Sequence, residues 1–570
     1  MHDVVIRGGR VVDGTGARAG GRRAPSRGPH RRGGQGSGPG RQRVIDADGA
    51  VVTPGFVDIH SHYDAQVTWD PWLSPSGHHG VTTVVMGNCG VGFAPARPDK
   101  RDWLIGLMEG VEDIPGAAMT EGIQWDWETF PEFLDAIERR PHAIDFGTQV
   151  PHGAVRGYVM GQRGADNEVA TEADVAAMAA IVEEGLRAGA LGFSTSRTIL
   201  HRSIDGVPVP GTFADRRELF GIGRALKRAG HGVFQMAVEH HDALKELPWM
   251  RDLAAEIDRP ISFNLQQVDQ APELWRAVLA ALDEAAADGL PLFAQVPGRP
   301  IGVLMCWQGT AHPFLGYPTW HRLAGLPVAE RAAALASPAV RAQMLSETPM
   351  DLGDFGNFVT RSFHKMFPLG TCNYEPRPDE SVAAVAAQRG ERPEAVVYDL
   401  LNAQGGEAIV YFPLFNYTHQ DFEVVRALHA HPRTRMGLAD GGAHCGAVCD
   451  GGMPTYMLTH WTRDRVRGPR LPLEFVVHRQ TRQTAALYGL GDRGVLAPGY
   501  RADVNVIDLD RLHLDPPRMV YDLPAAGRRL LQDARGYLHT LCAGQVIASG
   551  DAPTGALPGR LVRGPQASPA

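Results

Sequence analysis

The segment Val52-Thr-Pro-Gly-Phe-Val-Asp-Ile-His60-Ser-His62-Tyr-Asp64 decides the fold. Its apolar residues lead directly into two histidines that are separated by one residue. Because side chains alternate along a strand with a period of two, His60 and His62 are predicted to point to the same side. Two imidazoles at the C-terminal end of a buried strand supply half of a divalent metal site. The alternative is a pair of surface histidines where a strand meets a loop.

Two later segments also end in residues that bind metals. Gly80-Val-Thr-Thr-Val-Val-Met-Gly-Asn-Cys89 is a β-branched, apolar run that ends in a cysteine, and Met436-Gly-Leu-Ala-Asp440 ends in an aspartate before two glycines. Taken singly, such a cysteine is more often a core residue, and such an aspartate a turn residue. Three strand ends with this chemistry favour one shared site, whose predicted metal ligands are His60, His62, Cys89 and Asp440.

Between these segments, apolar strands alternate with alanine-rich helical stretches. Residues 171–188 are predicted to be helical and precede the strand from Gly189, and residues 275–289 precede a strand from Pro291. Alternation over this length predicts a parallel α/β barrel. Because barrel active sites lie at the C-terminal ends of strands, the four candidate ligands are expected to meet there.

Composition narrows the class of protein. The chain has 570 residues, of which 44% are hydrophobic, and a net charge of −8, which argues against a nucleic-acid-binding surface. Neither a signal-peptide core nor an apolar run of membrane-spanning length is present in the sequence. The six cysteines are scattered, as in a reduced compartment. We expect a cytoplasmic enzyme with a small-molecule substrate and no nucleic-acid or membrane partner; the oligomeric state is left open.

With these motifs the chain resembles the amidohydrolase superfamily, and within it the N-acyl-D-amino-acid deacylase (D-aminoacylase) branch. The resemblance rests on five blocks: Pro54 to Asp64, Gly80 to Gly90, Gly189 to Thr195, His431 to the Asp440-Gly turn, and Gly494 to Asp503. It implies an α/β fold, namely a metal-dependent hydrolase TIM-like (β/α)8 barrel over residues 54–490. A small β-sandwich would be built from residues 1–53 and 491–560, with 561–570 as a tail. It also implies that Cys89 takes the metal-bridging place of that branch.

The expected reaction is hydrolysis of a carbon–nitrogen amide bond. A Zn²⁺ ion held by histidines and a carboxylate lowers the pKa of bound water and polarises a carbonyl. Asp440 would be the catalytic general base and acid, taking a proton from the water and delivering it to the leaving amine. The leading substrate is an N-acyl (D-)amino acid or a related amide. Two alternatives are a hydrolase of a cyclic amide or carbamate, and a non-catalytic scaffold with an amidohydrolase-like fold.

Two segments depart from the pattern of the branch. The branch carries a histidine near the position of Ala237 and a Ser-His-His-Lys motif where this chain has Ser262-Phe-Asn264-Leu. In the branch, two histidines at these positions and the cysteine hold the tighter metal. Because both histidines are missing here, we expect one strong zinc site and a doubtful second one. Compensating ligands, or ordinary loop residues, are Glu239, His240, His241 and His201.

Three further residues are candidates for substrate binding. Arg197, at a strand end, is a possible substitute for the missing lysine in binding an anion. His152 follows another strand end and could line the pocket. His444 follows the Asp440 turn and could bind the substrate or orient Asp440. Each could equally be a structural or surface residue.

Residues 17–43 are nearly all Arg, Gly, Pro, Ser and Gln, without apolar periodicity. They are predicted to be irregular. A disordered basic loop, a nucleic-acid-binding arm and a local reading-frame error are the three interpretations. Resequencing of the gene would decide between the error and the other two.

Overall fold

The computed structural model describes residues 4–17 and 43–569. Nine parallel strands form two sheets in the central part of the chain. The first contains, in spatial order, β5 (Phe56–Asp58), β6 (Val81–Met86) and β7 (Asp145–Thr148). The second contains, in spatial order, β8 (Val150–Pro151), β9 (Gly192–Ser196), β10 (Val233–Ala237), β11 (Ile261–Asn264), β12 (Leu292–Val296) and β16 (Thr434–Met436). The sheets adjoin at both ends, because only Gln149 separates β7 from β8 and Ser61 forms a parallel bridge with Gly441.

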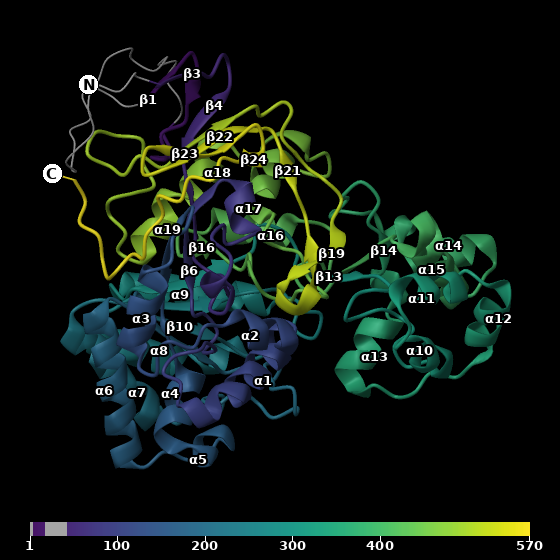
Figure 1. The fold of residues 1–570 in the computed structure, drawn as a ribbon, viewed down its shortest axis with the longest axis horizontal. Coiled ribbons are helices and arrows are strands. Elements are labelled where there is room, and N and C mark those ends of the chain that lie inside the picture. Colours follow the sequence, from purple (N-terminus) through teal and green to yellow (C-terminus); the bar gives the residue numbers. More distant parts are fainter. Residues whose placement is uncertain (1–3, 18–42, 570) are drawn as a thin grey trace.

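Helices alternate with these strands, as the sequence predicts. They are α3 (Phe130–Glu138), α4 (His152–Met160), α6 (Glu172–Ala188), α7 (Arg216–Ala229), α8 (Leu247–Ile257), α9 (Leu274–Ala287) and α16 (Glu423–Ala430). Figure 1 shows most of them gathered around β10 in the blue and teal part of the chain. The predicted helix 171–188 is α6, which Thr171 begins with a capping box to Asp174. No helix within the described ranges is long and apolar enough to cross a membrane.

Apart from the helices of residues 302–413, the other α-helices and one π-helix lie in connections between strands. They are α1 (Arg101–Glu112), α2 (Gly116–Gly122), α5 (Gln162–Ala165), α17 (Met453–Tyr456), the π-helix Met457–Asp464, α18 (Leu473–Arg479) and α19 (Arg482–Leu487). Of these, α1 bears directly on the candidate site, because its last residue contacts one of the predicted ligands.

Residues 302–413 form a lobe that the sequence analysis did not anticipate within the predicted 54–490 unit. Its strands β13 (Gly302–Met305), β15 (Val410–Pro413) and β14 (Phe367–Pro368) are antiparallel. Its helices are α10 (Pro318–Leu323), α11 (Val328–Leu335), α12 (Pro338–Ser346), α13 (Gly353–Arg361), α14 (Val382–Arg389) and α15 (Pro393–Asn402). The lobe has its own core, which includes Trp307, Phe314 and Tyr398. It stands apart on the right of Figure 1.

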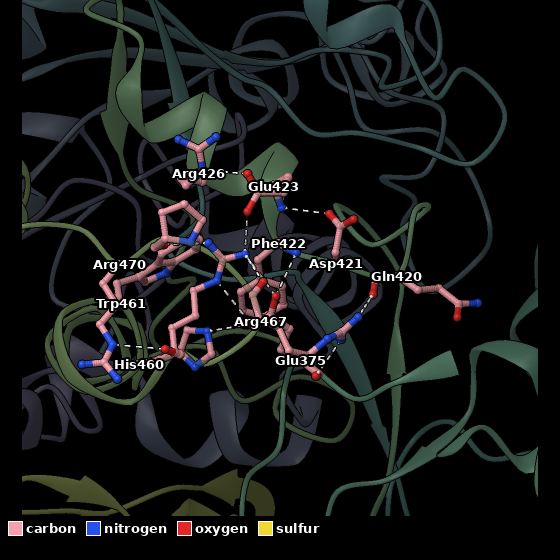
Figure 2. Close-up of polar contacts among 12 residues, drawn as sticks. Glu375, Gln420, Asp421, Phe422, Glu423, Arg426, His460, Trp461, Arg467 and Arg470 are labelled. Atoms are coloured by element: carbon pink, nitrogen blue, oxygen red, sulfur yellow. Dashed lines mark hydrogen bonds and ion pairs between the residues drawn. The ribbon is translucent and has the colours of Figure 1, made fainter. Parts of the chain in front are cut away.

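Figure 2 shows a polar network that ties this lobe to the π-helix and α16. Glu375, from the lobe, lies 3.0 Å from His460 Nε2 and 3.2 Å from Arg465 Nη2. The same Arg465 nitrogen lies 2.9 Å from a carboxylate oxygen of Glu423, at the start of α16. The Arg465 side chain is fully buried, so the loss of either carboxylate would leave part of its charge unpaired. The network has a structural role.

Strands from both ends of the chain share one sheet, which is visible at the upper left of Figure 1. In spatial order they are β2 (Arg10–Val11), β4 (Val51–Pro54), β17 (Val504–Ile507), β22 (Tyr537–Cys542), β23 (Gln545–Ser549) and β24 (Ala552–Pro553). Smaller pairs are β1 (Val4–Arg7) with β3 (Arg43–Asp46), β18 (His513–Leu514) with β21 (Ala534–Arg535), and β19 (Arg518–Leu523) with β20 (Gly527–Leu531). Residues 18–42 lie outside the described ranges, so the interpretations of that segment stay predictions.

Candidate metal centre

The four predicted ligands converge at three strand ends. His60 and His62 follow β5, Cys89 follows β6 and Asp440 follows β16. The nearest ligand atoms of His60, His62 and Cys89 all lie within 4.8 Å of one another. Asp440 Oδ1 lies 3.4 Å from His60 Nε2 and 3.7 Å from His62 Nε2. We call these four residues the metal centre.

The turn that carries Cys89 is held tightly. Cys89 has a φ of +57°, which is uncommon for a residue with a side chain and is often found at functional sites. The side chain of Asn88 donates hydrogen bonds to the carbonyls of Ser61 and Val85. Gly90 packs so closely on the backbone of Thr195 that a Cβ would lie 2.9 Å from the Thr195 Cα. This turn therefore places Sγ 3.4 Å from His60 Nε2.

The turn that carries Asp440 interlocks with the histidine segment. Asp440 has a φ of +47°, and its N–H donates to the carbonyl of His60 over 3.2 Å. The N–H of His62 in turn donates to the carbonyl of Gly441 over 2.8 Å. Backbone hydrogen bonds in both directions thus fix the carboxylate beside the two imidazoles.

Both imidazoles direct Nε2 towards the centre and Nδ1 towards a side-chain oxygen. His60 Nδ1 lies 2.6 Å from Gln295 Oε1, and His62 Nδ1 lies 3.2 Å from Glu112 Oε1. Metal-ligating histidines almost always have such a partner on the other nitrogen. The sequence analysis missed Gln295 and Glu112. Gln295 could have been found, because it is a single polar residue inside an apolar strand. No feature of the sequence around Glu112 indicates a role at the site.

The electrostatics of the centre suit a cation. Burial raises the pKa of Asp440, but the hydrogen bond from His62 and the nearby His60 outweigh burial and hold this pKa well below its usual value. Burial lowers the pKa of His60 to about 4. An ionised Asp440 beside a neutral His60 is the protonation state that metal binding requires. Burial lowers the pKa of His62, but Glu112 and Asp440 outweigh burial and raise it well above its usual value, so a cation would have to displace a proton from His62. Burial raises the pKa of the Cys89 thiol to about 11, so a cation would have to displace its proton.

At the ends of β10 and β11, Gln235 and Asn264 bond to the backbone. Gln235 Oε1 accepts a hydrogen bond from the Cys89 N–H, and Asn264 Oδ1 accepts one from the Val238 N–H. Both side-chain oxygens are thereby occupied by the backbone. The possible compensating residues also contact other groups: Glu239 accepts from Ile199 N, His241 pairs with Glu239, His201 bonds Ser196 and His240 packs on Phe415. Among the described residues, His60, His62 and Cys89 are the one group of three ligating side chains close enough together to hold a metal.

The three predicted substrate-binding residues differ in placement. His444 lies at the metal centre, with Nε2 3.7 Å from Glu112 Oε2 and a side chain that is 30% exposed. Arg197 donates to the carbonyl of Ala214 and pairs with Glu246. His152 is buried, and its two ring nitrogens lie 2.8 Å from Thr195 Oγ1 and 2.8 Å from Glu218 Oε1. No described hydrogen bond or ion pair joins Arg197 or His152 to the centre.

We expect Glu218→Gln to destabilise the protein by about 3–5 kcal/mol, because it leaves the buried Arg156 guanidinium without its carboxylate. Burial raises the pKa of Glu218, but His152 and Arg156 outweigh it and lower this pKa to about 2, so the native carboxylate is ionised. Urea unfolding would measure the loss. Glu183→Gln, which weakens the surface ion pairs with Arg187 and Arg228, is the control and should change stability by less than about 1 kcal/mol. Unchanged stability in Glu218→Gln would contradict a structural role for this cluster.

Comparison with known proteins places the chain among amidohydrolases. Residues 43–548 match the family model of the amidohydrolase family. An uncharacterized protein of Mycobacterium tuberculosis (strain ATCC 25618 / H37Rv) is 30% identical over 507 residues, which cover 84% of this chain and 79% of that protein. The D-aminoacylase of Alcaligenes xylosoxydans xylosoxydans is 27% identical over 468 residues, which cover 81% of this chain and 79% of the relative.

Solved structures agree on the fold. A crystal structure of D-aminoacylase, described as defining a novel subset of amidohydrolases, matches with a TM-score of 0.63 at 24% identity and covers 99% of this chain and 100% of the other. The zinc and phosphonate complex of N-acyl-D-glutamate deacylase from Bordetella bronchiseptica matches with a TM-score of 0.59 at 21% identity over 99% of both chains. The predicted resemblance and the predicted enzyme class, a hydrolase, are confirmed. The chain belongs to the amidohydrolase family.

Proposed function

We propose that the chain is a metal-dependent amidohydrolase that deacylates an N-acyl amino acid or a related amide, with one zinc ion at the metal centre. The observation that carries the proposal is the convergence of two Nε2 atoms, one thiol and one carboxylate at three strand ends. The relatives named D-aminoacylase and N-acyl-D-aspartate deacylase support an N-acyl amide as the substrate. His60, His62, Cys89 and Asp440 would hold the metal.

We also propose that the two parallel sheets close into a (β/α)8 barrel. With β7 and β8 counted as one strand interrupted at Gln149, the three-stranded and six-stranded sheets supply the eight strands that this barrel requires. The bridge between Ser61 and Gly441 supports closure at the other junction. The sheet that joins the two ends of the chain supports the small terminal sandwich.

The proposed reaction uses Asp440 to move one proton. When bound, zinc lowers the pKa of a water molecule towards neutrality and polarises the substrate carbonyl. The Asp440 carboxylate accepts a proton as the water oxygen adds to the carbonyl carbon. It then returns this proton to the amide nitrogen as the carbon–nitrogen bond breaks, which yields a carboxylic acid and an amine. The low pKa of Asp440 keeps it ready to accept, and the partly exposed His444 is the candidate to bind the substrate.

Hydrolysis of a cyclic amide or carbamate is the second candidate function. It is favoured by the end of β11, where Asn264 and Leu265 follow Phe263 and the lysine motif of the branch is absent. A substrate without a carboxylate would not need that lysine. A non-catalytic scaffold would have no need of converging ligands on three strands.

A hydrolysis screen with added zinc tests these functions. The panel contains N-acetyl derivatives of D- and L-amino acids, their neutral amides, hydantoins and dihydropyrimidines. Turnover of N-acetyl amino acids supports the proposal, and turnover of the cyclic compounds alone would replace it by the second candidate. A zinc-loaded protein that hydrolyses none of them would favour the scaffold.

We expect Cys89→Ala to weaken zinc binding by at least ~10–100-fold. Removal of a residue that only supports a metal ligand already lowers the affinity by this amount, and Cys89 is itself a proposed ligand. The reason is that its Sγ stands beside His60 Nε2 in the centre. Competition with a chromophoric chelator would measure the affinity. Cys306→Ala, which removes another buried thiol, is the control and should keep the wild-type affinity. Full zinc affinity in the Cys89→Ala protein would show that this thiol is only a core residue.

A further inference from the structure

Glu112 places one buried carboxylate between two histidines of the site. It is the last residue of α1 and is 1% exposed. Its Oε1 lies 3.2 Å from His62 Nδ1, and its Oε2 lies 3.7 Å from His444 Nε2. The carbonyl of Glu112 also accepts a hydrogen bond from the His444 N–H. One residue therefore contacts both a predicted metal ligand and the candidate substrate-binding histidine.

The contact with His62 is exclusive on both sides. The 3.2 Å between Glu112 Oε1 and His62 Nδ1 is an ion-pair distance without hydrogen-bond alignment, and neither atom has a hydrogen-bonding partner in the described parts of the chain. An ionised carboxylate is an acceptor only, and a neutral imidazole has one N–H. A proton on Nδ1, facing Glu112, leaves the Nε2 lone pair free on the side of Cys89 and Asp440. His60 has the equivalent arrangement with Gln295, but there the acceptor is uncharged.

The neighbouring residue, Asp113, makes the side-chain hydrogen bonds to the 440–446 loop, so the Glu112 side chain is not needed for that contact. Asp113 adopts a φ of +51° and ends α1. Its carboxylate accepts hydrogen bonds of 2.9 Å from Thr310 Oγ1 and of 2.9 Å from the Gly446 N–H. The backbone of the 440–446 loop is thus fastened to α1 by Asp113. The side chain of Glu112 is left to the two imidazoles.

The charge of Glu112 also needs compensation. The ion pairs of Glu112 within the described residues are with His62 and His444, and none is with a lysine or arginine. A buried carboxylate is costly to keep without a positive partner, and the partner available here is the His62 ring or a cation bound to that ring. A cation bound to Nε2 of His62 would compensate the negative charge of Glu112 across the imidazole ring. The Glu112 carboxylate would in turn make His62 a stronger metal ligand.

We propose that Glu112 is a positioning residue, which fixes the Nδ1-protonated form of His62 for the metal and holds His444 beside the centre. The inference rests on the proposed function, because it assigns a role at the same metal centre. We therefore expect the loss of Glu112 to weaken zinc binding, and the hydrolysis rate to fall as a consequence.

The test compares Glu112→Ala and Glu112→Gln with Asp113→Asn, which loosens the same loop without contacting His62. Zinc affinity should fall by about 10–100-fold in Glu112→Ala and by less in Glu112→Gln, whose amide oxygen can still accept from His62. The visible spectrum of the cobalt-substituted protein should change in both variants. Asp113→Asn should keep the affinity and the spectrum. With the best substrate of the screen, kcat should fall more than KM rises in the Glu112 variants.

The outcomes separate the inference from the proposed function. A wild-type protein that binds no zinc would overturn both. A wild-type protein that binds zinc, with folded Glu112 variants of equal zinc affinity and identical cobalt spectra, would overturn the inference alone. If Glu112→Ala does not fold, the near-isosteric Glu112→Gln decides by the same two measurements.

Discussion

Asp440→Asn should fold and bind zinc, yet hydrolyse its substrate at least ~10²–10⁴-fold more slowly than the wild-type protein. Asparagine keeps an oxygen that can coordinate a metal, but it cannot accept a proton from the attacking water. The fold should survive because Asp440 lies in a turn after β16, and its backbone hydrogen bond to His60 does not involve the carboxylate. The prediction therefore separates proton transfer from metal binding.

Circular dichroism, zinc content and hydrolysis rate, measured on one preparation, test the three parts of this prediction. Asp379→Asn changes an exposed aspartate of the 302–413 lobe in the same way and should leave all three unchanged. A folded, zinc-loaded Asp440→Asn protein with near-wild-type turnover would exclude Asp440 as the proton carrier. If the variant loses zinc as well, Asp440 is needed mainly as a ligand.

Local periodicity explains how much of the site could be predicted. His60 and His62 could be paired because a strand repeats every two residues. Cys89 and Asp440 could be added because each follows an apolar run, and parallel strands bring such ends to one edge. Helix α6 was predictable for a similar reason, since Thr171 and Asp174 give its start a local signal.

Contacts between distant segments explain what was missed. Glu112 meets His62 only because α1 folds back over the strand ends, and no spacing in the sequence encodes that contact. Gln295 and Gln235 lie inside apolar strands, where a single polar residue does not reveal its partner. For Arg197, the strand-end position was visible in sequence, but its pairing with Glu246 depends on the three-dimensional packing.

The 302–413 lobe was missed for a related reason. Its strands β13 and β15 pair across more than a hundred residues, and β14 contributes only Phe367 and Pro368. The helices of the lobe, such as α14 and α15, are short and give weak amphipathic patterns, and the antiparallel pairing of its strands has no local signal in the sequence. The lobe's separate aromatic core shows that the predicted 54–490 unit contains more than alternating strands and helices.

Removal of zinc should abolish hydrolysis, and one equivalent of zinc per chain should restore it fully. The expectation of one tight site follows from the ends of β10 and β11. There the residues are Gln235 and Asn264, whose amide oxygens accept backbone hydrogen bonds. Neither residue supplies an imidazole to a second ion. Within the described ranges, His60, His62 and Cys89 form the cluster able to hold a metal, with Asp440 beside it, so without zinc the site lacks the group that activates water.

Calorimetric titration of the chelator-treated protein, with hydrolysis measured at each addition, gives the stoichiometry and the restored activity together. His60→Ala should bind no zinc tightly, because it removes the imidazole whose Nε2 lies 3.4 Å from both Asp440 Oδ1 and Cys89 Sγ. His364→Ala, which removes an exposed histidine of the lobe, should bind one equivalent like the wild-type protein. Two tight equivalents in the wild-type protein would refute the single site and would require ligands from His201, Glu239, His240 or His241 after rearrangement. Full activity in metal-free protein would refute the metal-dependent mechanism, since Asp440 alone has no activated water from which to take a proton.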